Sequence, residues 1–330
     1  MNTHSKSLLG LMLGLSVLSV PAQAESIKDK VDNLQISGFV DSSWSSTNAV
    51  AGATSTGFGL DAVELDVEYT EDNVGMRFDL NGAPSAGGNV TQDGLLEQGY
   101  VFVNFPAGED AVTFKFGKFN APIGWELLDA PDMYQFSHSL VFNNGLPVNL
   151  TGASLSAAFG MVDGVIYYAD KVDTNGVTTT GVHSAGSRIG LTPLEGVNVG
   201  FSYLNTNNPG TVATRTLDVD FTYDAIENLV IGAEYNQITD YTPNVNAGGY
   251  FATIHYDFTD MFGATYRYGN FDFDTNLAGK ATQNTFALTS AVGGGLGALF
   301  EYSTITDTSG TLVTAGFTQK TYAFEMTYSF

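Results

Sequence analysis

The last ten residues of the chain alternate between large apolar side chains and small or polar ones. The apolar set is Tyr322, Phe324, Met326, Tyr328 and Phe330, and the other set is Thr321, Ala323, Glu325, Thr327 and Ser329. A period of two is that of a β-strand, whose successive side chains point to opposite faces of a sheet. The pattern predicts a final strand with one apolar face, which a membrane barrel or the core of a soluble sandwich would bury.

The same alternation recurs along most of the chain. It covers residues 63–69, 74–80, 197–203, 217–223, 229–235, 250–256, 262–268 and 296–302. Most of these runs end in tyrosine, as is typical of strands that leave lipid at the headgroup level, where aromatic rings form a girdle. The opposite face of the first two runs is charged. In a soluble sandwich that face would meet bulk water, whereas in a barrel it lines the lumen.

Short and long connections alternate between the predicted strands. The short ones are 71–73, 106–111, 160–164, 192–196, 224–228, 259–261 and 292–295, and the long ones are 46–56, 82–93, 120–149, 171–183, 205–211, 239–247, 270–282 and 306–315. Outer-membrane barrels alternate short periplasmic turns with longer outside loops in this way. We therefore predict an all-β fold, a transmembrane antiparallel barrel of about sixteen strands, with fourteen or eighteen as alternatives.

The amino terminus has the features of an export signal. A leucine-rich run, 7–20, follows Lys6 and precedes the small-x-small site Ala22-Gln23-Ala24. This pattern predicts a signal peptide over 1–24 and a mature barrel over 25–330. A membrane anchor is the alternative, but the run is shorter than the roughly 18 residues that a spanning helix needs.

The amino-acid composition argues against several classes of function. Cysteine is absent, which excludes disulfides, thiolate metal sites and a thiol nucleophile. Twelve basic and 35 acidic residues give a formal net charge of −23, or −24 once Lys6 is removed with the signal. This charge argues against a nucleic-acid partner. Charged residues are only 14% of the chain, which is low for a soluble surface.

One stretch resembles a known family. The residues Phe116-Gly-Lys-Phe-Asn-Ala-Pro-Ile-Gly-Trp-Glu126, then 136–142 and Leu146-Pro147, are similar to the G-K-F-x-x-P-x-G-x-E core and following segments of the porin-2 (OmpL-like) family. His138 stands where an arginine is common. The resemblance, specific over about 114–152 and diffuse elsewhere, implies a bacterial outer-membrane porin without cofactors, in which small hydrophilic solutes or ions diffuse passively.

Partners are likewise implied by resemblance. Tyr328 and Phe330 end the chain in a way that resembles the assembly signal of outer-membrane barrels. This implies recognition by the barrel-assembly machinery and periplasmic chaperones, and insertion into outer-membrane lipid. Sixteen-stranded porins are trimers, so a homotrimer is implied as well.

The alternation assigns candidate lumenal charges. The candidate pore-lining residues are Glu64, Asp66, Glu68, Arg77, Asp79, Lys115, Arg188, Asp218, Asp220, Glu234, Arg267 and Glu301. Carboxylates outnumber basic groups in this set, and Glu325 adds one more. Because fixed carboxylates lower the potential in a narrow aqueous pore, we predict a preference for cations.

The connection 120–149 is the longest and too apolar to stay solvated. It follows the fifth predicted strand, as the third outside loop does in the porins that the chain resembles. It either packs on the rim or a neighbouring subunit, or bends into the barrel. In the second case the candidate constriction residues are Trp125, Glu126, Asp129, Asp132 and His138.

The sequence gives little support for catalysis or for metal binding. His138 and Ser139 are adjacent, so on an extended chain their side chains point apart. Asp170, Asp173 and Asn175 lack the glycine and the distant glutamate of a calcium loop. We therefore predict no catalytic and no metal site. The rivals to a channel are a plugged or narrow barrel acting as adhesin, receptor or structural protein, and then an outer-membrane hydrolase.

Overall fold

The computed structural model describes residues 31–48, 54–82, 95–107, 110–170, 172, 181–207, 209–277 and 279–330. The expected signal peptide lies outside these residues. Two units are separated at Leu34, and the described part of the first contains a 3-10 turn, η2 (Val31–Asn33). Among the described residues, no helix has the length and apolarity required to span a membrane.

Sixteen strands form the second unit. The first eight are β1 (Leu34–Asn48), β2 (Thr54–Glu71), β3 (Val74–Asn81), β4 (Leu96–Ala107), β5 (Asp110–Asn120), β6 (Asn149–Phe159), β7 (Val162–Ala169) and β8 (His183–Leu194). The others are β9 (Val197–Asn207), β10 (Thr214–Tyr223), β11 (Leu229–Thr242), β12 (Val245–Asp257), β13 (Phe262–Asp272), β14 (Ala281–Gly293), β15 (Leu296–Asp307) and β16 (Thr318–Ser329).

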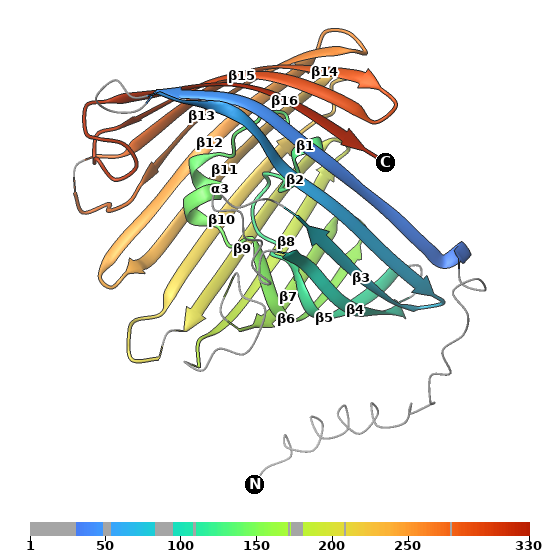
Figure 1. Cartoon of the computed structure of the whole chain (residues 1–330). Helices are drawn as coiled ribbons and strands as arrows, with labels where there is room; N and C mark the ends of the chain where they lie inside the picture. Colours follow the sequence, from blue (N-terminus) through green and yellow to red (C-terminus); the bar gives the residue numbers. More distant parts are fainter. Residues whose placement is uncertain are drawn as a thin grey trace. The chain divides into compact units, whose positions relative to one another are not determined.

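The strands close into one antiparallel barrel in sequence order (Figure 1). Its seam is the pairing of β1 with β16, in which Ser43 faces Glu325 and Asp41 faces Thr327. Closure leaves no unpaired sheet edge, which is what a strand-built protein needs in lipid. The predicted barrel of sixteen strands is confirmed.

Alternation in β16 follows the predicted faces. Tyr322, Phe324, Met326 and Tyr328 are 41–47% exposed on the outside, whereas Ala323 and Glu325 are buried on the inside. The apolar side chains therefore form the outer face, which suits lipid.

One predicted loop is mostly strand. Residues 239–247 were expected to be a long connection, but β11 and β12 extend through them and meet at Pro243 and Asn244. Asn244 has φ 65°, a left-handed conformation that asparagine tolerates well. The prediction was wrong because polar residues were taken as a loop signal, although strand pairing is made by the backbone and tolerates them.

The connection between β5 and β6 enters the interior of the barrel. It contains a 3-10 turn, η4 (Ala130–Asp132), and one short helix, α3 (Leu140–Gly145). The helix lies within the ring of strands and contacts β11, β12, β13 and β14 (Figure 1). The barrel interior is thus partly filled by its own chain.

Candidate pore and its inner loop

The segment 121–148, called here the inner loop, is shaped by local sequence. Ser139 caps α3, since its Oγ accepts a hydrogen bond from the backbone N–H of Phe142 at 3.0 Å. Gly124 has φ +85°, a conformation that residues with a Cβ rarely adopt, and a Cβ there would meet Leu146 at 2.5 Å. These residues turn the chain inward after β5.

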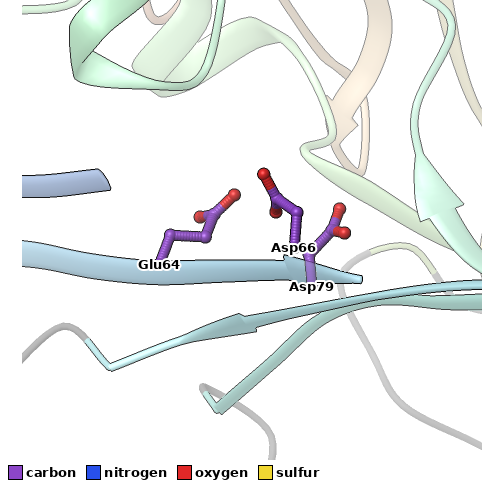
Figure 2. Close-up of side chains that lie close together, drawn as sticks. All are labelled: Glu64, Asp66 and Asp79. Atoms are coloured by element: carbon purple, nitrogen blue, oxygen red, sulfur yellow. The ribbon is translucent and has the colours of Figure 1, made fainter. Parts of the chain in front are cut away.

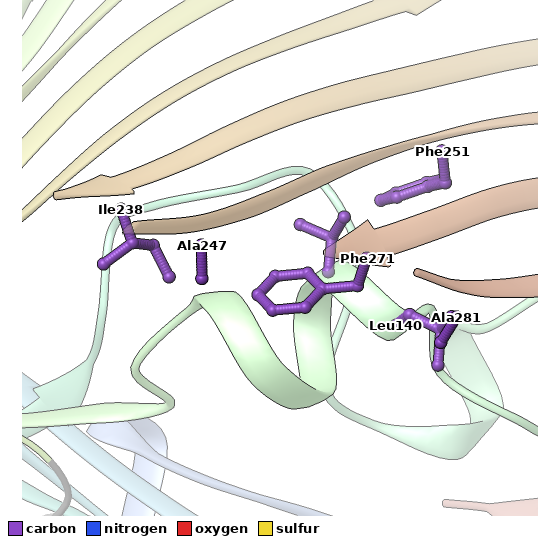
Figure 3. Close-up of a cluster of buried hydrophobic side chains, with 7 residues drawn as sticks. Leu140, Ile238, Ala247, Phe251, Phe271 and Ala281 are labelled. Carbon is purple, nitrogen blue, oxygen red and sulfur yellow. The ribbon is translucent and has the colours of Figure 1, made fainter. Parts of the chain in front are cut away.

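An apolar seat on the inner wall receives the helix. Leu140 and Val141 of α3 pack with Phe251 of β12 and Phe271 of β13, in a cluster that also contains Ile238, Ala247 and Ala281 (Figure 3). All seven are buried. Burial of each large apolar side chain contributes about 1.5–3 kcal/mol, so this seat favours the inner position of the loop.

Trp125 extends the seat toward β11. Its ring lies 6.0 Å from that of Phe251, centroid to centroid. The ring covers Gly232, where a Cβ would stand 2.4 Å from it. A side chain at Gly232 would therefore displace the indole, and the glycine allows this close approach.

Polar anchors fix the same segment at three strands. Glu234 of β11 accepts the backbone N–H of Trp125 at 2.7 Å, and Glu301 of β15 accepts that of Ser137 at 2.9 Å. Arg267 of β13 forms an ion pair with Glu126 and donates to the Ser137 carbonyl at 2.6 Å. The loop thus lies inside the barrel rather than over its rim.

A row of carboxylates faces the loop from the other wall. Glu64 and Asp66 of β2 and Asp79 of β3 project to the same side of the sheet (Figure 2). Arg77 forms an ion pair with Asp79 at 2.8 Å and lies 3.7 Å from Asp66. Asp79 is further held by Gln98, whose Nε2 donates to it at 2.5 Å.

A second group, called here the acidic cluster, consists of Glu64, Glu97 and Asp129. Their carboxylate oxygens lie within 4.8 Å of one another. The Nδ2 of Asn81 donates to Glu64 at 3.0 Å and to Glu97 at 3.2 Å. Among the described residues, no lysine or arginine forms an ion pair with the cluster. Burial, with Glu97 and other carboxylates nearby, raises the pKa of Asp129 to about 7.

Several other charges predicted to be lumenal also lie on the inner face. Arg188 of β8 pairs with Asp220 of β10, and Asp218 accepts from the Nδ2 of Asn236 at 3.3 Å. Lys115 of β5 lies 4.5 Å from the centroid of the Tyr100 ring. A cavity of about 670 Å³ lies between the inner loop and β5 to β8.

The predicted constriction residues divide into two groups. Trp125, Glu126 and His138 serve the attachment or internal order of the loop, and the His138 Nε2 lies 3.1 Å from the Leu127 carbonyl oxygen. Burial lowers the pKa of His138. Asp129 precedes η4 and belongs to the acidic cluster, whereas Asp132 is the last residue of η4, which contacts β16.

Sequence reasoning missed several residues of this interior. The seat residue Phe251 occupies a position that the alternation assigns to the lumen, where polar groups were expected, and Phe271 lies in the predicted connection 270–282, although β13 runs to Asp272. For Phe251 a signal was present, because its neighbours Tyr250 and Ala252 are apolar too, so that the strand has no polar face there. Glu97 was missed because β4 showed mixed faces.

Several solved porins share the fold. The anion-selective porin from Comamonas acidovorans matches with a TM-score of 0.67 at 14% identity, over 90% of this chain and 99% of that one. The DcaP channel of Acinetobacter baumannii matches with 0.67 at 12%, over 90% and 97%. The trimer form of OmpT from Vibrio cholerae matches with 0.62 at 13%, over 90% and 99%.

Sequence comparison assigns the family. No curated protein sequence matches the chain. The family model described as "Putative beta-barrel porin-2, OmpL-like" matches residues 33–330, which include all sixteen strands of the barrel. The chain is a porin-like outer-membrane barrel and belongs to this family.

Proposed function

We propose that the protein is a passive diffusion channel for small hydrophilic solutes or ions and that it prefers cations. The observation that carries the proposal is the inner loop, which is fixed inside the barrel by Arg267, Glu234 and Glu301. Held there, it narrows the passage beside the acidic cluster. Pore width and lumenal charge together then set what passes.

The arrangement of charge supports the preference. Arg77, Arg188 and Arg267 are each paired with a carboxylate, which offsets their charge. The acidic cluster has no such partner among the described residues. Unpaired carboxylates beside a low-dielectric wall lower the local potential and concentrate cations. The anion-selective porin from Comamonas acidovorans shares only the fold, and selectivity depends on side chains.

Planar-bilayer recording of the refolded protein tests the proposal. We expect stepwise conductance and, in a KCl gradient, a reversal potential of the sign for cation preference. The preference should decrease from 0.1 M to 1 M salt, because the Debye length falls from about 10 Å to about 3 Å. A folded protein that does not conduct would instead indicate the plugged barrel, acting as adhesin, receptor or structural protein.

Export and assembly complete the proposal. We infer a cleaved signal over 1–24, outer-membrane lipid as the surroundings, and recognition of Tyr328 and Phe330 by the assembly machinery. The trimer form of OmpT suggests a homotrimer here. Mass measurement in detergent, together with chemical cross-linking in intact outer membranes, tests the homotrimer, and a single-subunit mass with no cross-linked species would refute it.

A further inference from the structure

Two buried carboxyl groups meet at the seam of the barrel. Asp41 of β1 is 4% exposed and Glu325 of β16 is 2% exposed. Because Ser43 faces Glu325 and Asp41 faces Thr327, the two acids are diagonal neighbours on the inner face. Asp41 Oδ1 and Glu325 Oε2 are buried and receive no hydrogen bond from any other described residue, and the two carboxyl groups are close enough to share a hydrogen bond with each other.

A cavity opens beside this pair. It has a volume of about 280 Å³ and lies between the inner loop and strands β1, β2 and β16. Asp61, Glu97 and Asp129 add three carboxyl groups to its wall, with Asn81 as a further oxygen donor. No lysine or arginine is among its lining residues, and the Nε2 of the lining His138 faces the Leu127 carbonyl. We call it the seam cavity.

The acidic lining of the seam cavity favours a positively charged ligand. Two unpaired carboxylates removed from bulk water are unfavourable unless a counter-charge or a proton lies between them. Carboxylate and amide oxygens are the ligands of hard divalent cations, whereas softer metals take nitrogen or sulfur ligands. A water occupies about 30 Å³ of liquid, so the cavity has room for an ion that keeps several waters.

We propose that the seam cavity binds one partly hydrated divalent cation, Mg²⁺ or Ca²⁺, through Asp41 and Glu325. The site joins the first and last strands, so the ion also fastens the closure of the barrel. This proposal depends on the geometry of the barrel and of the inner loop, and it does not require that the pore conducts.

A second buried pair supplies the matched control. Asp218 of β10 and Glu234 of β11 are both buried, and each has one carboxylate oxygen without a hydrogen bond from the described residues. Here, however, each acid has a hydrogen-bond donor, because the Nδ2 of Asn236 donates to Asp218 and the backbone N–H of Trp125 donates to Glu234. This pair therefore needs no metal ion.

Isothermal titration of the detergent-refolded, chelator-treated protein tests the site. CaCl₂ and MgCl₂ are titrated separately at constant ionic strength into the wild type, the Asp41→Asn/Glu325→Gln variant and the Asp218→Asn variant. We expect one equivalent bound by the wild type and by Asp218→Asn, and at least a tenfold weaker affinity in the double variant. Absence of binding to the wild type, or equal binding to the double variant, would overturn the proposal and leave a shared proton between the two acids.

A thermal measurement keeps the test valid if the double variant folds poorly. The cation should raise the unfolding temperature of the wild type and of Asp218→Asn, because a ligand that binds only the folded state stabilises it. It should not raise that of the single variant Glu325→Gln, which retains Asp41. An equal rise in all three proteins would place the ion elsewhere and refute the assignment. Failure of bilayer conductance would not affect either readout.

Discussion

Arg267 and Glu126 form an ion pair inside the barrel, although 141 residues separate them in the sequence. Their side chains are 1% and 6% exposed, so both charges are removed from bulk water. The arginine also donates to the Ser137 carbonyl, so one residue holds the inner loop at two points, Glu126 and Ser137. The position of the inner loop therefore depends on Arg267 of strand β13.

The first prediction concerns this pair. Arg267→Met should lower the free energy of unfolding by about 3–5 kcal/mol, because it leaves Glu126 buried without a partner. The double variant Arg267→Met/Glu126→Leu should recover much of that loss, since no unpaired charge remains. Urea unfolding in detergent measures both. Arg215→Met, at an exposed position of β10, is the control and should change stability little; equal losses in the single and double variants would contradict the coupling.

Removal of the central part of the loop tests its place in the pore. A deletion of residues 128–141 takes away the first two residues of α3, its N-cap Ser139 and the contact of Ser137 with Glu301. We expect a marked rise in single-channel conductance while the barrel stays folded by circular dichroism. If the deleted protein folds and conducts as the wild type does, the loop does not limit the passage.

The apolar seat makes a separate contribution. Phe271→Ala should cost about 3–5 kcal/mol, because Phe271 is fully buried against α3 and leaves a cavity. We also expect noisier, more frequently changing conductance, because the loop loses its support. Phe324→Ala truncates an aromatic on the outer face of β16 and should leave the conductance unchanged. Similar current traces for the two variants would show that the seat does not hold the loop.

Charge selectivity should depend on the acidic cluster. The variant Glu64→Gln/Glu97→Gln/Asp129→Asn removes three carboxylates without changing side-chain size, so the potential in the lumen becomes less negative. We expect the reversal potential in a salt gradient to move toward zero. Glu227→Gln changes an exposed carboxylate in the turn between β10 and β11 and serves as the control. A preference that survives the triple variant would assign selectivity to other residues.

The terminal residue should matter for closure. Phe330 exchanges two backbone hydrogen bonds with Gly38, at 3.1 and 3.3 Å, which extend the seam by one residue. Deletion of Phe330 should reduce the yield of folded barrel in the outer membrane, whereas Phe330→Tyr should retain most of it. Quantification of heat-modifiable protein in isolated membranes provides the measurement. Normal assembly of the deletion variant would show that Phe330 is not part of the assembly signal.

The sequence by itself determined the strands and their faces. Residues Tyr322 to Tyr328 and the hairpin 63–80 alternate with a period of two, and this local pattern decides which side chains point outward. The same alternation placed the carboxylates of β2 and β3 on the inner face. The alternation of short and long connections was enough to count the strands, even though the connection at 243–244 proved far shorter than expected.

Only the tertiary structure decided what the inner faces contact. The sequence around Phe251 and Phe271 is the same whether water, lipid or a loop covers these side chains. Periodicity indicates the face on which a side chain lies, and it does not indicate what that face contacts. The pairing of Arg267 with Glu126, and of Asp41 with Glu325, requires closure of the barrel and the register of strands far apart in sequence. Such contacts depend on the three-dimensional path of the chain, which no local pattern records.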